Sequence, residues 1–391
     1  MTEKKSLTDR TGKKPGKRVA AALAAAVLLL LLCLYAIGHR QGWFSSNAGT
    51  MDGSKAVADG FREKSGELLL HWQQYSIESG HEPYEVAYDG KHVFYLGAVP
   101  ADNGEEALTG LVAVSVADGE EEAAGVYNLA APGEIWENLQ FAEDGNLDRE
   151  YGGVLTYDNV QEDGKEEGLF QNPRESNLGR ESFWMYQIDA KDKTPHLLCW
   201  DGTLYWFAED GDGTALYRAD ETTGAAEKVV TVEKTGAAVD CANPAAALQN
   251  GLISWISEEK QLVRMDLQQG KQRDILSVNG IEPDAVQCNE NFMICTDVEG
   301  NTYAYSYLTD TAYFLDKASS SEEGWQVYLR GDLVWMACGS EIRLFDLLEM
   351  ATFVLDPTKM GLRGFDGLRA AQNGSLLVWS RTDNGFVIIS K

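Results

Sequence analysis

Few residues of this 391-residue chain have the types and spacing that catalysis or metal binding needs. No two of the five histidines lie at the helical spacing of a zinc site, and no HExxH motif occurs. The chain also lacks a nucleophile elbow, a phosphate-binding loop and a dinucleotide fingerprint. The sequence therefore predicts no catalytic residue, no metal ligand and no cofactor. The histidines are His39, His71, His81, His92 and His196.

Two short segments match a chemical pattern in isolation. Ser257 and Lys260 fit the SxxK pattern, but they lie in a polar turn between strand-like runs, whereas a catalytic SxxK begins a helix. Residues 209–213 place carboxylates on a tight turn that could hold calcium, but the twelve-residue loop with its terminal Glu is missing. We interpret the first as a chance match and the second as an acidic hairpin.

Acidic residues dominate the part of the chain that follows the first forty residues. The whole chain has 33 basic and 61 acidic residues, and residues 1–40 hold eight basic and two acidic ones. Residues 41–391 therefore carry 25 basic and 59 acidic residues, a net charge of −34. Such a surface repels nucleic acid and anionic lipid, and it favours cationic partners and divalent cations.

Tryptophan and cysteine are the remaining candidates for function. Trp206, Trp255, Trp335 and Trp379 each fall in a strand-like run, where large side chains fill the space between sheets. The functional alternative is stacking on a sugar or a peptide. Outside the first forty residues the number of cysteines is odd and no CxxC occurs, which predicts buried free thiols rather than a disulfide framework. These cysteines are Cys199, Cys241, Cys288, Cys295 and Cys338.

The elements that must position any site are short hairpins. An Asn-Gly or Asp-Gly pair precedes several apolar runs, and both residues of such a two-residue turn need positive φ. The pairs are Asp89-Gly90, Asp201-Gly202, Asn250-Gly251 and Asn373-Gly374, with Gly331-Asp332 as a reversed copy.

The apolar runs recur at steps of 40 to 61 residues, close to the ~40–50 residues of a four-stranded propeller blade. Seven units fit; six or eight remain alternatives, because residues 196–200 could end unit two or begin unit three. We expect the strand-like run 67–77 to pair with the last unit, whose fourth strand is missing, and so to close the ring. The runs begin at Val93, Val154, Leu204, Leu252, Phe292, Leu333 and Leu376.

A second turn follows each hairpin. An Asp or Ser ends a strand, and Gly often stands four positions later. A short polar side chain can accept hydrogen bonds from nearby backbone N–H groups, and Gly can take the left-handed position. We therefore interpret these residues as structural rather than as ligands. The clear copies are Ser115, Asp220 and Asp266, and the weaker ones are Asp189, Ser306 and Asp346.

Two phrases carry a resemblance to a known group of proteins. LISWISEEKQLVRMDLQQGKQRDIL and LYWFAEDGDGTALYRADETTGAAEKVV resemble repeats of bacterial extracytoplasmic propellers of the TolB-like and low-density-lipoprotein-receptor (YWTD-like) types. The resemblance spans about residues 84–391 and implies a propeller without implying an activity. A quinone-cofactor signature is only partly matched, because Lys228 stands where it requires Trp.

The amino terminus predicts a membrane anchor. Residues 1–18 are basic, and residues 19–38 contain no charge over a length that spans a bilayer's hydrocarbon core. The basic flank predicts a cytoplasmic tail, with the rest of the chain outside the cell membrane. A cleaved signal peptide is the alternative. We expect a flexible stalk over residues 39–66 and the propeller over residues 67–391.

Two classes of function remain after these exclusions. The first is a single-pass, membrane-anchored binding or scaffold module of the cell envelope, with an unknown protein or cell-wall glycan as its partner. The second is an extracytoplasmic hydrolase or lyase of glycans or peptides, with carboxylates supplied by separate loops. A convergence of Asp, Glu, Arg and Tyr at one mouth of the channel would favour the second class.

Overall fold

The computed structural model describes residues 45–391 with several gaps. The gaps are residues 59, 78–79, 100–107, 118–119, 129–134, 144–152, 161–165, 172–183, 187–197, 201–202, 211–212, 220–225, 234–245, 250, 258, 269–272 and 319–325.

The described residues form seven sheets, each built on four antiparallel strands. Sheet 1 contains β4 (Glu82–Tyr88), β5 (His92–Val99), β6 (Leu108–Ala117) and β7 (Glu120–Asn128). Sheet 2 contains β8 (Ile135–Glu143), β9 (Gly153–Val160), β10 (Glu166–Gln171) and β11 (Trp184–Tyr186). Sheet 3 contains β12 (Leu198–Trp200), β13 (Thr203–Asp210), β14 (Gly213–Ala219) and β15 (Ala226–Glu233).

The carboxyl-terminal half supplies the other four sheets. Sheet 4 contains β16 (Ala246–Gln249), β17 (Leu252–Ile256), β18 (Leu262–Asp266) and β19 (Arg273–Asn279). Sheet 5 contains β20 (Pro283–Cys288), β21 (Phe292–Asp297), β22 (Asn301–Ser306) and β23 (Thr311–Lys317). Sheet 6 contains β24 (Gln326–Arg330), β25 (Leu333–Cys338), β26 (Glu341–Asp346) and β27 (Ala351–Leu355). Sheet 7 contains β28 (Gly367–Ala370), β29 (Leu376–Ser380), β30 (Gly385–Ser390) and β3 (His71–Ser76).

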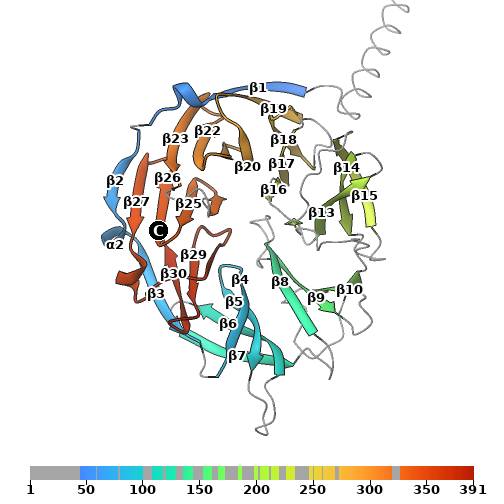
Figure 1. Ribbon diagram of the computed structural model, residues 1–391, viewed down its shortest axis with the longest axis vertical. Coiled ribbons are helices and arrows are strands. Elements are labelled where there is room, and N and C mark those ends of the chain that lie inside the picture. The colour runs from blue at the N-terminus through green and yellow to red at the C-terminus, as the bar shows by residue number, and fades with distance from the viewer. Residues whose placement is uncertain are drawn as a thin grey trace, which may run out of the picture.

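The sheets are arranged around a common centre, each with its first strand innermost (Figure 1). This is a β-propeller, so the predicted all-β propeller fold is confirmed. The ambiguous run at residues 196–200 contributes β12, which pairs with β13 and therefore begins sheet 3. Sheet 2 takes its fourth strand from β11 instead.

One strand of sheet 7 comes from the amino-terminal side of the chain. β3 lies antiparallel to β30, with Trp72 opposite Ile389 and Tyr75 opposite Phe386. The first part of the run 67–77 is not a strand, because α2 (Gly66–Leu69) forms a single helical turn before β3 begins.

The segment directly before β3 differs from the expected stalk. β1 (Ser45–Asp52) pairs in parallel with β19, and β2 (Arg62–Ser65) pairs in parallel with β27. Between them lie η1 (Gly53–Lys55) and a bridge from Val57 to Tyr313 of β23. We call residues 45–70 the belt, because they follow the outer edges of sheets 4, 5 and 6 (Figure 1).

The belt corrects the prediction of a flexible stalk over residues 39–66 for the part from residue 45 onward. Its backbone N–H and C=O groups find partners along the outer strands, so it needs few apolar residues of its own. Three apolar side chains fasten it, one at each junction between sheets. Met51 packs between sheets 4 and 5, Phe61 between sheets 5 and 6, and Leu70 between sheets 6 and 7.

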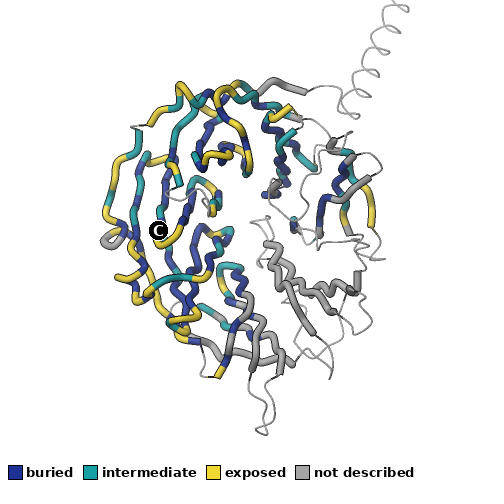
Figure 2. Tube along the Cα trace, viewed as in Figure 1, coloured by how far each residue is buried: buried dark blue, intermediate teal, exposed yellow. Residues whose placement is uncertain are grey.

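The hydrophobic core is divided among the junctions between neighbouring sheets. Each cluster of buried side chains joins two consecutive sheets, such as Trp255 of sheet 4 with Leu216 of sheet 3. Figure 2 shows buried residues along the inner strands of sheets 4 to 7 and exposed residues along their outer rim. At roughly 25 cal/mol per Å² of buried apolar surface, these junctions hold neighbouring sheets in fixed positions.

The predicted anchor, residues 19–38, lies outside the described residues. Of the helices that the structure does describe, none has the length and apolar character needed to cross a bilayer.

Candidate functional site

The first-turn residues cap their own hairpins. The side chain of Asp89 accepts a hydrogen bond from the backbone N–H of Lys91 at 2.7 Å, and Asn373 does the same for Ser375 at 3.0 Å. The glycines of these turns take the left-handed conformation that the sequence predicted, with φ of +93° at Gly90 and +85° at Gly374. The positive φ predicted for the glycines is therefore confirmed. Asp89 and Asn373 are not among the described residues with positive φ, so the prediction that both residues of each pair have positive φ is wrong here.

The second-turn residues are structural as well. Asp266 accepts from the backbone N–H of Gln268 at 2.8 Å, and Ser306 accepts from that of Thr309 at 3.3 Å. Four positions after Ser306, the left-handed position is taken by Asp310, with φ of +51°. The weaker copies at Ser306 and Asp346 are thus real turns in which a residue other than Gly has positive φ, at Asp310 and Met350.

Neighbouring turns are joined to one another by hydrogen bonds. Asn289, in the β20–β21 turn, accepts from the N–H groups of Asn291 and Phe292, both at 2.9 Å. Its Nδ2 donates to the carbonyl of Gly331 in sheet 6 at 2.6 Å. The series continues from Trp335 Nε1 to the carbonyl of Gly374 at 2.9 Å, and from Asn373 Nδ2 to the carbonyl of Gly90 at 3.2 Å.

Arg264 of sheet 4 holds the turn of sheet 5 from the other side. Its Nη1 donates to the carbonyls of Asn289 and Glu290, each at 3.0 Å. Its Nη2 pairs with Asp274 at 3.0 Å, and its guanidinium lies 3.8 Å from the ring centre of Tyr307. The first turns of sheets 5, 6, 7 and 1 are therefore linked in series, with Trp335 of β25 supplying the link from sheet 6 to sheet 7, and Arg264 of β18 joins sheet 4 to this series. We call these turns the rim, and it is organised before any ligand arrives.

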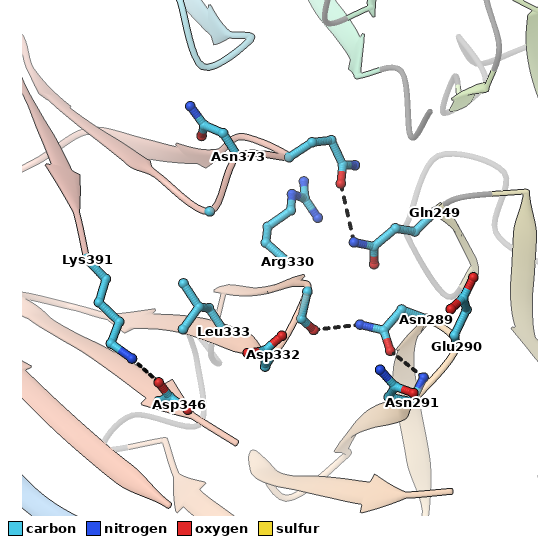
Figure 3. A pocket seen from close by; sticks show the side chains of 13 residues that line it. Gln249, Asn289, Glu290, Asn291, Arg330, Asp332, Leu333, Asp346, Asn373 and Lys391 are labelled. Atoms are coloured by element: carbon cyan, nitrogen blue, oxygen red, sulfur yellow. Dashed lines mark hydrogen bonds and ion pairs between the residues drawn. The ribbon is translucent and has the colours of Figure 1, made fainter. Parts of the chain in front are cut away.

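A cavity of about 600 Å³ lies between the first turns of sheets 4, 5, 6 and 7 (Figure 3). Turns from different sheets meet here because the first strand of each sheet is innermost. The volume lies in the range of small-molecule and peptide-side-chain sites. We call this cavity and its wall the mouth.

Both cations of the mouth are engaged by the protein itself. Lys391 pairs with Asp346 and lies 3.2 Å from Glu349. Burial lowers the pKa of the Lys391 ammonium, but the hydrogen bonds to Asp346 and Glu349 outweigh burial and leave it raised. Arg330 donates to the carbonyls of Ala370 and Leu329, each at 2.9 Å.

Two carboxylates of the mouth are unpaired. In the part of the chain that the structure describes, no hydrogen bond or ion pair engages the carboxylate of Glu290 or Asp332, which stand on the turns of neighbouring sheets 5 and 6. The amide of the exposed Asn291 lies on the same wall. Arg330 keeps its positive charge, because its partners are neutral carbonyls. The described wall therefore has three carboxylates against two cations, a net charge of −1.

The described wall residues include no hydroxyl, thiol, imidazole or phenol group. They are Gln, Asn, Glu, Asp, Arg, Lys, Gly and Leu, with no Ser, Thr, Cys, His or Tyr among them. Asp, Glu and Arg do converge at one mouth, as the hydrolase alternative requires, but Tyr is not among the described lining residues. No group of three or more potential metal ligands occurs within the described ranges.

The sequence-predicted candidates lie elsewhere. All four tryptophans are buried packing residues: Trp206, Trp255, Trp335 and Trp379 are 5% exposed or less. Ser257 and Lys260 form the β17–β18 turn, where Ser257 accepts from the N–H of Gln261 at 3.1 Å and Lys260 has φ of +59°.

Three cysteines lie buried among the described residues. Cys288, Cys295 and Cys338 are buried free thiols, and burial raises the pKa of Cys288 to about 11. A thiol with so high a pKa is protonated at neutral pH and is a poor nucleophile. Cys241, His39, His196, Asp189, Asp220 and residues 211–212 of the acidic hairpin lie outside the described residues.

No known protein family and no curated protein matches this chain. Several solved structures resemble it at low sequence identity. The structure of YCF48 bound to a D1 peptide has 10% identity and a TM-score of 0.47, over 86% of this chain and 96% of that one. BamB from Moraxella catarrhalis has 13% identity and a TM-score of 0.42, over 83% and 100%.

A third similar structure is PorZ of Porphyromonas gingivalis, with 14% identity and a TM-score of 0.42. The match covers 80% of this chain but only 37% of PorZ. At sequence identities this low, the similarity is one of fold alone. The finer resemblance to TolB-like and YWTD-like propellers stays a prediction.

Proposed function

We propose that this chain is a binding module, a seven-bladed propeller whose mouth holds an extended segment of a partner protein. The observation that carries the proposal is the combination of a rim linked from sheet to sheet by hydrogen bonds with unpaired carboxylates at Glu290 and Asp332. A site built on a rigid frame loses little conformational entropy when a ligand binds.

The chemistry of the wall favours a basic protein segment. Amide side chains such as Asn291 can donate to and accept from a peptide backbone. Glu290 and Asp332 can pair with a Lys or Arg side chain, and the net charge of −34 over residues 41–391 attracts such a segment from a distance. A glycan ligand is less well served, because none of the described wall residues is an aromatic platform for a sugar ring.

Membrane anchoring is the second part of the proposal. The basic residues 1–18 and the uncharged residues 19–38 support an anchor with the propeller outside the cell. Because β1 begins at Ser45, only residues 39–44 separate that run from the propeller. Six residues reach at most about 20 Å, so the propeller would be held close to the bilayer.

Topology can be tested directly. Protease added to intact cells should remove the propeller and leave a membrane-bound stub. Protection of an epitope fused after Lys391 in intact cells, followed by its loss on permeabilisation, would place the propeller inside.

A second candidate is a hydrolase or lyase. The observation in its favour is that Glu290 and Asp332 stand on neighbouring turns of one cavity, since two carboxylates can divide the acid and base roles. Turnover that is lost in Glu290→Gln or Asp332→Asn would establish this class.

One experiment separates the two candidates. Peptides produced from envelope proteins by cleavage after Glu are passed over the immobilised protein, and the retained peptides are weighed by mass spectrometry. Binding predicts retained peptides of unchanged mass, enriched in internal Lys and Arg and released by salt. Shortened products, or cleavage of a glycan panel, would instead support the enzyme, and retention of acidic peptides would contradict both.

A further inference from the structure

The belt reaches the wall of the mouth through one carboxylate. Lys64 of β2 pairs with Glu349 at 2.8 Å, and Glu349 also lies 3.2 Å from Lys391. Lys391 in turn pairs with Asp346, and both Lys391 and Asp346 line the cavity. A continuous series of charged contacts therefore runs from the amino-terminal belt to the proposed binding site.

The same turn holds one of the two unpaired carboxylates in position. Glu349 and Asp346 belong to the turn between β26 and β27, where the Asp346 side chain accepts from the N–H of Glu349 at 2.6 Å. One residue after Asp346, the N–H of Leu347 donates to the carbonyl of Asp332 at 2.9 Å. Any movement of this turn would shift the backbone that carries the Asp332 carboxylate.

The ion pair between Lys64 and Glu349 positions side chains and adds little to the free energy of unfolding. Lys64 and Glu349 have side chains 36% and 51% exposed, so their ion pair is screened by solvent. In contrast, the side chain of Asp346 is 3% exposed, and Lys391 supplies its counter-charge. Glu349 contacts both Lys64 and Lys391. It therefore links the exposed ion pair of the belt to the buried side chain of Asp346.

We propose that the belt sets the geometry of the mouth through Glu349, with Lys64 as a positioning residue. Docking of the belt and binding of a ligand at the mouth then favour each other, because each stabilises the same arrangement of the β26–β27 turn. The effect on ligand binding rests on the proposed function, whereas the effect on the turn does not. A force on the amino-terminal segment, or a competing contact to it, would therefore weaken ligand binding at the mouth.

The test compares two identical substitutions in the belt. Lys64→Met keeps an unbranched apolar side chain and removes the ammonium. It thereby removes both the ion pair to Glu349 and the contact of Nζ with the Phe353 ring, whose centre lies 5.5 Å away. Lys55→Met is the matched control, since Lys55 pairs at 2.9 Å with Asp52 at the other end of the belt. Hydrogen exchange of the full chain is followed at the amides of Leu347 and Ser54.

Lys64→Met should speed exchange at Leu347 by about twofold to fivefold and leave Ser54 unchanged. Lys55→Met should do the reverse, because the N–H of Ser54 donates to Asp52. Glu349→Gln should speed Leu347 at least as much as Lys64→Met, and adding Lys64→Met to it should bring no further increase. Exchange at Leu347 that is unchanged in Lys64→Met and Glu349→Gln would overturn the proposal.

A second arm uses ligand binding and keeps the two proposals apart. A ten-residue peptide of Ser, Gly and Lys is titrated into each variant. If Lys64→Met weakens its binding and Lys55→Met does not, the coupling extends to the ligand. If the peptide binds no variant while the exchange pattern holds, the proposed ligand is wrong, but the coupling between the belt and the β26–β27 turn stands. If both variants bind the peptide equally, the proposal that the belt affects ligand binding is overturned.

Discussion

Gln249 donates a hydrogen bond of 3.3 Å to Gln372 across the mouth of the propeller. Gln249 ends β16 of sheet 4, and Gln372 lies in the β28–β29 turn of sheet 7, so the bond spans two intervening sheets. Gln249 is only 6% exposed, and both side chains line the cavity (Figure 3). The bond therefore joins sheet 4, the first sheet that the belt follows, to sheet 7, the sheet next to the last one that it follows.

Removing the acceptor of this bond should have a modest effect on folding. Gln372→Ala leaves the buried Gln249 amide without its partner and should lower the free energy of unfolding by about 0.5–1.5 kcal/mol. Gln268→Ala is the control, because Gln268 is an exposed turn residue whose side chain makes no hydrogen bond in the described structure. Urea unfolding of the two variants measures the difference, and equal midpoints would argue against a formed bond.

Asn289 should matter more than its neighbour Asn291. Asn289→Ala removes two accepted hydrogen bonds and the bond to Gly331, so we expect a loss of about 1–3 kcal/mol in the free energy of unfolding. Asn291→Ala removes only an exposed side chain and should stay within about 0.5 kcal/mol. The account of the rim fails if thermal melts rank the two variants the other way.

The belt should be required for full stability. Met51 is fully buried between sheets 4 and 5, and Met51→Ala should cost about 2–5 kcal/mol. Leu308→Ala, at a side chain 85% exposed, should be nearly neutral.

A chain beginning at Ser45 should melt like the full protein, whereas one beginning at Arg62 should melt lower and aggregate, because β19 loses its neighbour. Equal melting of the two chains would show that the belt contributes nothing.

Stability should fall in acid. Hydrogen bonds from Lys64 and Lys391 lower the pKa of Glu349, and the hydrogen bonds of Arg363 lower that of Asp383. A carboxylate whose pKa is lower in the folded state stabilises it above the unfolded pKa, and this contribution is lost as the pH falls through the folded pKa. The melting temperature should therefore drop below about pH 4. Glu349→Gln should show a shallower drop than the wild type, and parallel curves would contradict the pairing.

The hairpin turns could be predicted from the sequence because their conformation is local. Gly90 and Gly374 need positive φ whatever surrounds them, and an alternating apolar run after each turn identifies the strand. Asn289 was missed because its turn, Asn289-Glu290-Asn291, contains no Gly. The capping role of Asn289 could have been recognised from the sequence, because Asn289 stands at the same position in its turn as Asp89 and Asn373 in theirs.

The belt and the mouth could not be predicted in the same way. The belt is held largely by backbone hydrogen bonds, which any residue except Pro can make, and it carries one apolar anchor about every ten residues. Met51 and Phe61 are therefore too far apart to form a periodic signal. Glu290 and Asp332 come together only because their turns belong to adjacent sheets. The spacing of these two residues along the chain does not indicate that they are close in space.

The most direct test of the central claim is a reversal of charge at the mouth. The wild type, Glu290→Lys with Asp332→Lys, and the control Glu259→Lys with Glu282→Lys are each screened against one random decapeptide library at low and high salt. The control changes the same charge at exposed residues at the opposite end of their sheets. The account predicts that the wild type and the control select Lys- and Arg-bearing peptides, while the mouth variant selects acidic ones. The same preference in all three proteins would contradict a binding site at the mouth.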